Sequence, residues 1–342
     1  MKKPDTSTAL RWIWSRKIYW VMLLFIFLMH APFVPSKGEE KQTQEFSKVY
    51  QQFNETIKEE LKKPQKITLL AGLTLLGLGV LGVGIILFFT WGLEFMRHSR
   101  TDHLPAPWKF WDLFRVVILS FFWGELGFLI VLAGCRRLGV GVKDLNDHFL
   151  MLVGTLWIDL LVFFFILSIV IGQTGGTWKH LGLTSRGFFR NVATGILGYV
   201  SALPILLITL LTVLAAVQIL KYEPPPQPIQ EIFFMEKGGT LLIASILAAL
   251  VGPFFEELFF RGFLYNTLKK RLSPMTALWV TSAFFAGIHG NLFGFFPIMG
   301  LSALLTLLYE KTGSLVASIT VHILHNSLMI GFLFLAKELG GL

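Results

Sequence analysis

The sequence is poor in cysteine and in charge, and both shortages narrow the class of protein. Cys135 is the single cysteine among 342 residues, which excludes an intrachain disulfide and a metal cluster built on several cysteines. Charged residues make up 15% of the chain, against roughly a quarter in soluble domains. Hydrophobic residues make up 54%, and the mean hydropathy is +0.65. This composition predicts an integral membrane protein.

The formal net charge of +9 does not indicate a nucleic-acid partner. Lysine and arginine lie mostly between the hydrophobic segments, where they orient a membrane protein and meet anionic lipid headgroups. The lipid bilayer is therefore the partner that this charge predicts.

Long apolar segments predict an all-α, polytopic fold. A spanning helix needs roughly 20 apolar residues, and about eight or nine segments qualify. They lie near residues 18–34, 67–90, 113–133, 150–172, 192–217, 239–268, 275–292, 294–309 and 314–335. We divide the chain into an N-terminal membrane region with four of these segments, residues 1–175, and a second region, residues 176–338. The charged stretch 36–66 carries apolar residues at helical spacing. We expect an amphipathic helix there that lies on the membrane, folds over the outer side of the protein, or forms a solvated linker.

The basic residues also predict the orientation. The first apolar segment follows five of them, and the HAPFVPS stretch at 30–36 is a poor cleavage site, so we expect a retained anchor rather than a signal peptide. With a cytoplasmic N-terminus, most loop lysines and arginines fall inside, and only Arg136, Arg137 and Lys143 fall outside. We expect a multi-pass protein of a bacterial plasma membrane.

Three polar clusters interrupt the apolar C-terminal third: Glu256-Glu257 with Arg261, then His289, then His322 with Asn326. An ionisable residue at membrane depth is costly, so it indicates a functional site with a partner. Counted along their helices, the clusters fall between the bilayer middle and the cytoplasmic face. We therefore predict one polar cavity that opens inward and belongs to a hydrolase that activates water.

The two glutamates should play different parts. Glu257 lies four residues before Arg261, the spacing of a helical ion pair, which predicts a structural role. Glu256 has no such partner and lies among phenylalanines, where desolvation favours proton uptake from water by a general base. Gly252-Pro253 should kink this helix and admit water. A blander alternative is that both carboxylates only hold helices together.

The histidines and the asparagine complete the predicted chemistry. Ser273-Pro274 reads as the start of the helix that carries His289, which we expect to orient the water or protonate the leaving amine. His322 and Asn326 share a helix face and have hydrogen-bond donors for an oxyanion. His325, on a neighbouring face, is a possible second residue behind them.

Two alternatives stay open at this point. Glu256, His289 and His322 form a conceivable zinc set, but the HExxH pattern is absent, and we favour a mechanism without a metal or other cofactor. Glu125 and Asp159 are further carboxylates within apolar segments, and with Glu256 and His289 they suggest a proton-coupled transporter as the alternative to an enzyme. A non-catalytic scaffold or self-immunity protein is a third interpretation.

The three clusters resemble the motifs of a known family. Residues 256–261 match EExxxR, 285–289 match FxxxH, and 322–326 match HxxxN, in the right order. The sequence here is similar to the CPBP family, the CAAX proteases and bacteriocin-processing enzymes of the ABI domain, which includes the type II CAAX prenyl endopeptidase. The motif core covers about residues 240–335.

The resemblance implies an intramembrane endopeptidase with a helical core and a cavity open to the cytoplasm. It implies that Glu256 and His289 activate water, that His322 and Asn326 form the oxyanion hole, and that Glu257 and Arg261 support them. The family is often labelled a metalloprotease, although a metal-free glutamate mechanism is argued for its CAAX members. Prenylated proteins, peptide precursors and membrane proteins are all compatible substrates.

Overall fold

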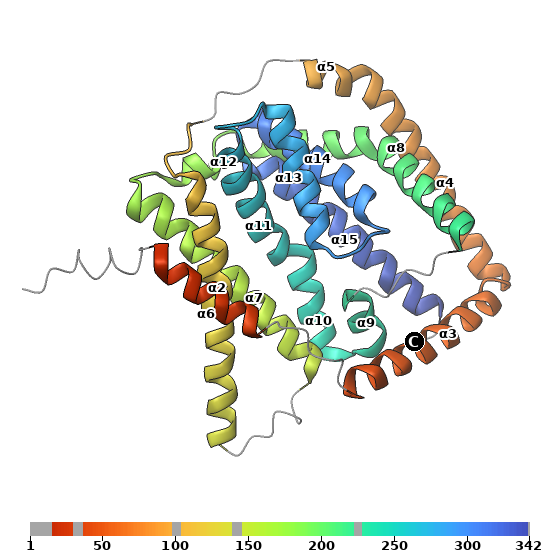
Figure 1. Cartoon of the computed structure of the whole chain (residues 1–342). Coiled ribbons are helices and arrows are strands. Elements are labelled where there is room, and N and C mark those ends of the chain that lie inside the picture. The colour runs from red at the N-terminus through yellow and green to blue at the C-terminus, as the bar shows by residue number, and fades with distance from the viewer. Residues whose placement is uncertain (1–15, 30–36, 98–103, 139–145, 222–227, 341–342) are drawn as a thin grey trace, which may run out of the picture.

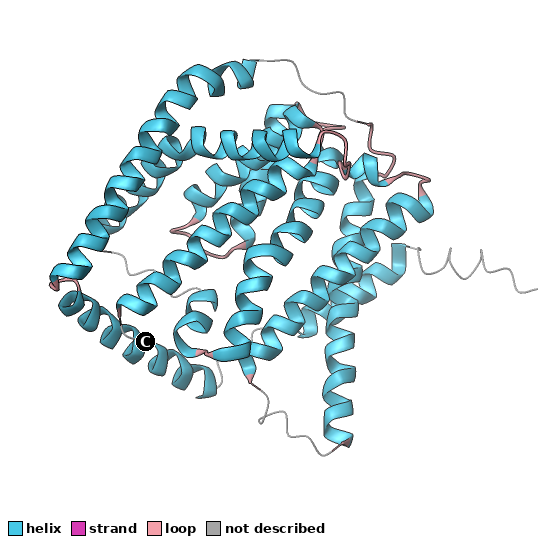
Figure 2. Ribbon diagram, turned by 180° about the vertical axis from the view of Figure 1, so that it is seen from behind, coloured by secondary structure: helices cyan, strands magenta, loops and turns pink. Residues whose placement is uncertain are grey.

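The structure, a computed structural model, describes residues 16–29, 37–97, 104–138, 146–221 and 228–340. Within these ranges every regular element is a helix, as predicted, and no strand occurs (Figure 2). The predicted cleavage region at 30–36 lies outside the described residues, as does most of the loop at 224–228.

The helices follow one another along the chain in the arrangement of Figure 1. They are α2 (Arg16–Met29), α3 (Lys37–Glu60), α4 (Pro64–Leu87), α5 (Leu93–Arg97), α6 (Phe110–Arg137), α7 (Asp147–Leu167), α8 (Phe188–Leu220), α9 (Pro228–Met235), α10 (Gly238–Ile246), α11 (Gly252–Glu257), α12 (Asn266–Leu268), α13 (Pro274–Ile288), α14 (Phe295–Thr312) and α15 (Leu315–Leu339). π-Helical segments at Phe88–Gly92, Ser168–Gln173, Leu247–Val251 and Leu258–Tyr265 join or extend several of them, and Trp178–Leu181 forms a short 3₁₀ helix.

Each predicted apolar segment forms a helix within the described residues, and six helices of that part of the chain are long and apolar enough to cross a bilayer, with shorter apolar helices beside them. They are Pro64–Arg97, Phe110–Arg137, Asp147–Gln173, Phe188–Leu220, Gly238–Leu268 and Leu315–Leu339. The segments predicted at 18–34, 275–292 and 294–309 correspond to the shorter helices α2, α13 and α14. α13 and α14 pack against each other as a hairpin whose two ends meet the rest of the chain on one side of the molecule (Figure 1).

The second half of the chain forms a tightly packed bundle around α14 and α15. α8 packs against both of these helices. At the α8–α15 contact Gly195 lies so near the backbone of α15 that a Cβ atom built on it would come within 2.7 Å of the carbonyl oxygen of Ala317. A larger side chain at position 195 would separate the two helices, so this glycine sets their spacing.

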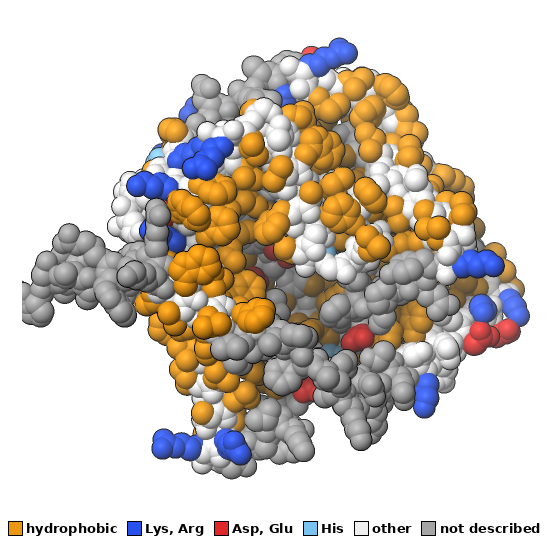
Figure 3. All heavy atoms as spheres, viewed as in Figure 1, with side chains coloured by type: hydrophobic (Ala, Val, Ile, Leu, Met, Phe, Trp, Pro, Cys, Tyr) orange, Lys and Arg blue, Asp and Glu red, His pale blue; other side chains and the backbone are white. Residues whose placement is uncertain are grey.

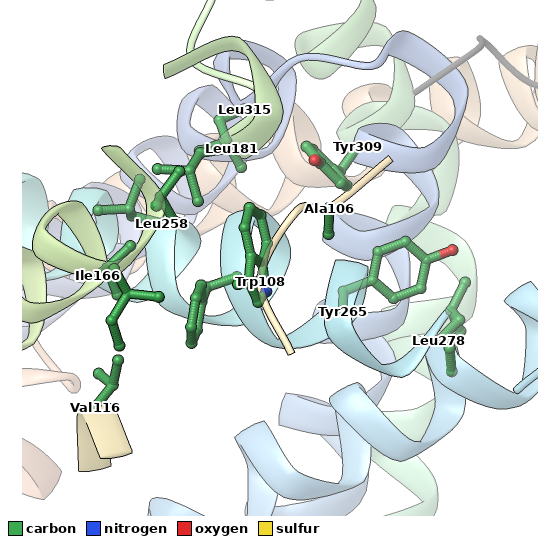
Figure 4. Packing of buried hydrophobic residues seen from close by; sticks show 14 residues of the cluster. Ala106, Trp108, Val116, Ile166, Leu181, Leu258, Tyr265, Leu278, Tyr309 and Leu315 are labelled. Carbon is green, nitrogen blue, oxygen red and sulfur yellow. The ribbon is translucent and has the colours of Figure 1, made fainter. Parts of the chain in front are cut away.

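One buried core joins the two regions predicted from the sequence (Figure 4). Trp108, just before α6, stacks on Phe263 with ring centroids 5.0 Å apart, and its indole Nε1 donates to Thr267 Oγ1 at 2.8 Å. Ile166 of α7 and Tyr309 of α14 belong to the same cluster. The N-terminal helices therefore support the bundle that carries the polar motifs.

The predicted amphipathic helix is α3, which packs against α9. Phe46 and Phe53 of α3 are buried, and both rings lie edge-on to Phe234 of α9, at 6.1 and 4.8 Å between centroids. Of the three arrangements expected for the 36–66 stretch, the structure thus shows a helix folded against the protein, at the end of the molecule where α15 ends (Figure 1).

Candidate active site

A cavity of about 610 Å³ lies inside the bundle, between α7, α9, α10, α11, α13, α14 and α15. Its lining is mostly aliphatic, with a few polar groups. The polar lining residues are Thr155, Asp159, Glu256, His289, His322, His325 and Asn326. Figure 3 shows acidic side chains set back in a hollow on the face where Figure 1 places α11. The four predicted catalytic residues therefore border the same space.

Glu256 reaches this cavity from α11. Its side chain is one-third exposed, at 33%, and its Oε2 atom is buried without a hydrogen-bond partner among the described residues. The nearest basic nitrogen given for it is His322 Nε2, 3.7 Å from Oε2. A carboxylate oxygen that is left open in an apolar cavity is suited to accept a proton from a bound water.

Glu257 points the other way and is fully buried with Arg261, as the four-residue spacing predicts. Arg261 Nη1 lies 2.7 Å from Glu257 Oε1. The guanidinium also donates to the Ser302 hydroxyl at 2.6 Å and to Thr306 Oγ1 at 3.3 Å, and it lies 4.8 Å from the centroid of the Phe285 ring. Arg261 thus joins α14 and α13 to the helix that carries both glutamates.

His322 is held by Glu257. Its Nδ1 lies 2.8 Å from Glu257 Oε1, and the ring is 3% exposed. A carboxylate paired with arginine only accepts hydrogen bonds, so Nδ1 must be the donor. In the neutral ring Nε2, which faces Glu256, is then an acceptor, and it becomes a donor only when the ring takes a second proton. The sequence interpretation of a neutral donor toward the oxyanion needs this refinement.

His289 is the residue at which α13 ends, and the predicted cap at the other end is present, because Ser273 Oγ accepts from the Thr276 N–H. The His289 Nδ1 lies 2.7 Å from the carbonyl oxygen of Phe285. Because a carbonyl only accepts, Nδ1 carries a hydrogen and Nε2 is left to accept one. An imidazole fixed in this tautomer is suited to orient a water or take up its proton.

Asn326 is positioned by an irregular turn next to Glu256. Gly252 N–H bonds the carbonyl of Leu247, five residues earlier, so the helix has π register here. Pro253 has no N–H to bond the next carbonyl, that of Ala248. Asn326 Nδ2 donates to this carbonyl at 2.8 Å. The predicted effect of Gly252-Pro253 therefore takes the form of a π-helical turn that fixes the asparagine and leaves its second amide hydrogen for another acceptor.

The structure also places residues whose roles the sequence left open. The Nδ1 atom of His325 lies 2.9 Å from the Tyr199 hydroxyl of α8, so it supports the α8–α15 contact at the cavity edge. Asp159 lines the cavity, whereas Glu125 is not among its lining residues. The four residues of the expected proton relay are thus not all brought together. Tyr199, Ser302 and Thr306 had no sequence signal, because each contributes through a partner on another helix.

The donor set does not fit a bound metal ion. Within the part of the chain that the structure describes, no group of three His, Cys, Asp or Glu side chains lies close enough to hold one. His322 Nδ1 donates to Glu257 and His289 Nδ1 to a backbone carbonyl, so only the two Nε2 atoms are left as potential ligands. The zinc set suggested by Glu256, His289 and His322 does not converge here.

The cavity has a definite place along the helices. Its lining residues lie toward the ends of α7, α10 and α15 that meet α9, whereas Lys269, Arg271 and Lys311 lie at the other ends of their helices. With the orientation predicted from the basic residues, the α9 end is not cytoplasmic. The cytoplasmic N-terminus and the inward-opening cavity both stay predictions.

Comparison with known proteins supports the family resemblance. Residues 238–328 match the family model described as type II CAAX prenyl endopeptidase, Rce1-like. This segment contains both glutamates, Arg261, His289, His322 and Asn326, and it does not include α2 to α9. No curated protein and no solved structure matches the chain significantly.

Proposed function

We propose that this protein is an integral-membrane endopeptidase in which Glu256 activates a water molecule against a peptide bond. The observation that carries the proposal is Glu256, whose Oε2 atom makes no hydrogen bond among the described residues and whose side chain lines a cavity together with His289, His322 and Asn326. The match of residues 238–328 to a family of endopeptidases supports it.

The reaction needs one proton acceptor and donors for a developing oxyanion. Glu256, with His289 Nε2 orienting the water, takes one proton as the water oxygen bonds to the peptide carbon. The proton passes across the 3.7 Å gap to His322 Nε2. Cationic His322 and the free amide hydrogen of Asn326 donate to the oxyanion. When the tetrahedral intermediate collapses, the C–N bond breaks and the proton on His322 passes to the leaving nitrogen, which gives a carboxylic acid and an amine. The carboxylate of Glu257 stabilises the cation on His322.

The substrate is a polypeptide that reaches the site within the membrane. The matched family is described by its action on prenylated CAAX proteins, so a prenylated or otherwise membrane-anchored protein is the substrate class to test first. The largely aliphatic lining of the cavity suits an apolar stretch of chain.

The test compares new peptide termini in membranes from cells that express wild type, Glu256→Gln or Glu125→Gln at equal levels. Glu125→Gln is the matched control, because it removes a carboxylate from a spanning helix outside the cavity lining. We expect termini that depend on Glu256 and persist in the control, with cleavage reduced about 10²- to 10⁴-fold in Glu256→Gln. Identical termini in all three would contradict the proposal.

A further inference from the structure

The cavity carries two carboxylates and no strong base to balance them. Glu256 and Asp159 both line it, and among the described lining residues there is no lysine or arginine. The remaining polar groups are three histidines, an asparagine and a threonine. A free C-terminal carboxylate would find no lysine or arginine here, whereas a cation would find two possible partners.

Among the described residues, Asp159 lacks the basic partner that other buried acidic residues have. Asp112 pairs with Arg115 at 2.8 Å, Glu310 with Lys269 at 2.6 Å, and Glu257 with Arg261 at 2.7 Å. Asp159 is partly buried and makes no hydrogen bond or ion pair with the described residues. A carboxylate at membrane depth without a partner among the described residues is costly to ionise and indicates a partner from outside them.

The helix that carries Asp159 forms one wall of the cavity. Met151, Leu152, Thr155, Leu156 and Asp159 recur at three- and four-residue spacing, so they share one face of α7, and all of them line the cavity. The four residues that precede Asp159 on this face offer mainly apolar surface. Such a strip accommodates the methylene stem of a lysine or arginine while its charged end reaches a carboxylate.

We propose that Asp159 is a specificity-determining residue that binds a lysine or arginine side chain of the peptide substrate, near the bond attacked at Glu256. This inference rests on the proposed function and names the chemistry of its substrate: a mainly apolar segment with one basic residue. Asp159 lies outside the segment that matches the family model, so this preference is a property of the N-terminal region of this chain.

The experiment maps cleavage sites in membranes from cells that express wild type, Asp159→Asn, Asp159→Lys, Glu125→Gln or Glu256→Gln. We expect wild-type sites to carry lysine or arginine at one fixed position relative to the cut bond. Asp159→Asn should lower cleavage at these sites about 10- to 100-fold, the range of a lost charged hydrogen bond, and Glu125→Gln should not. A lipid-anchored reporter with the cleaved sequence is then made with its basic residue changed to glutamate. Asp159→Lys should cleave this reporter faster than wild type does, a gain that unfolding cannot produce.

Three outcomes would overturn the inference. Equal cleavage by wild type and Asp159→Asn would show that Asp159 does not contact the substrate. A uniform loss at all sites, without the gain for the charge-swapped pair, would place Asp159 in the chemistry with Glu256 instead. Cleavage sites without a common lysine or arginine would show that Asp159 does not bind a basic side chain of the substrate. If Glu256→Gln also leaves every terminus in place, the proposed function itself fails, and this result is distinct from the other three.

Discussion

At the scale of single residues, the site depends on two adjacent glutamates with opposite surroundings. Glu257 has an arginine and an imidazole as partners and no exposure, whereas Glu256 lines the cavity and its Oε2 atom makes no hydrogen bond among the described residues. On a helix, neighbours point about 100° apart, so one turn of chain supplies both an anchor and a proton acceptor. Glu257 also accepts a hydrogen bond from His322 Nδ1 and so sets the tautomer of His322. This contact links the Glu257–Arg261 ion pair to the proposed chemistry.

The ion pair predicts a large effect on folding. Arg261→Met should destabilise the protein by about 3–5 kcal/mol, because it leaves Glu257 buried without its counter-charge. The matched control is Lys58→Met in the exposed Glu55–Lys58 pair, whose side chains are 75% and 66% exposed and whose loss should leave the unfolding midpoint almost unchanged. Thermal unfolding in detergent measures both. Equal midpoints for Arg261→Met and wild type would show that the pair is not needed for stability.

Asn326 offers a prediction on turnover rather than on folding. Asn326→Ala removes the amide hydrogen proposed for the oxyanion and the bond to the Ala248 carbonyl. We expect turnover of a cleaved reporter to fall about 10²- to 10³-fold, as for one oxyanion donor. The unfolding midpoint, measured on the same preparation, should change little. Normal turnover by this variant would remove Asn326 from the mechanism.

The sequence predicted the residues of the site better than their contacts. The pairing of Glu257 with Arg261 follows from spacing within one helix and is present. The bonds from Arg261 to Ser302 and Thr306, and from His322 to Glu257, join segments more than 40 residues apart. Such contacts depend on how helices pack, and periodicity carries no information about that.

At the scale of helices, α9 is a short element that closes the cavity and is held at its C-terminal end. Lys337 Nζ of α15 donates to the carbonyl of Phe233 at 2.8 Å. Glu236, just after α9, accepts from Asn146 Nδ2 at 2.7 Å and lies 2.8 Å from His148 Nδ1. Ile229 and Ile232 of the same helix line the cavity. These polar contacts thus fix one cavity wall to α7 and α15.

The Glu236 contacts predict a dependence of stability on pH. Burial raises the pKa of the Glu236 carboxyl, and hydrogen bonds from Asn146 and His148 more than offset this, so its pKa lies below the usual value. The unfolded chain, with a glutamate pKa of about 4.3, then binds the proton more readily. The stabilisation is full above that pH and is lost as the pH falls through the folded pKa.

We therefore expect wild type to lose about 1 kcal/mol more than Glu236→Gln on acidification from pH 6 to pH 3, the size of one hydrogen-bond contribution. Unfolding midpoints across this range measure the difference. Glu231→Gln, on the same helix, is the control and should follow the wild-type profile. Parallel curves for Glu236→Gln and wild type would show that protonation of Glu236 does not change the stability of the protein.

The sequence predicted where helices occur better than it predicted how long they are. Every apolar segment predicted at the outset is helical, because hydrophobic runs of this length admit little else in a bilayer. The separation of α13 from α14 and their short lengths depend on the turn at 289–294, which lies within an almost unbroken apolar run. The predicted segments 275–292 and 294–309 already separate at this turn, but counting apolar residues did not show that α13 ends at Ile288.

At the scale of the whole molecule, the cavity lies nearer the α9 end of the bundle, as do Lys237 and Lys337, whereas Lys269, Arg271 and Lys311 lie at the other end. Because basic loops stay in the cytoplasm, we expect the cavity to be reached from the other side. In a Cys135→Ser background, a membrane-impermeant maleimide should label Leu333→Cys, in the cavity lining, in intact cells. It should label Lys311→Cys only after permeabilisation. The reverse pattern would place the cavity on the cytoplasmic side and show that the positive-inside orientation is wrong.

The α13–α14 hairpin has a consequence for water, the second reactant of the proposed hydrolysis. The 15 residues of α13 span about 22 Å, less than the roughly 30 Å of the hydrocarbon core, and Trp279, Phe284 and Ile288 on it are exposed. A helix shorter than the bilayer draws the headgroups inward. If the bilayer thins beside His289 in this way, bulk water has a shorter path to Glu256. The acyl-chain length of the surrounding lipids sets the bilayer thickness, so it would control how readily water reaches Glu256.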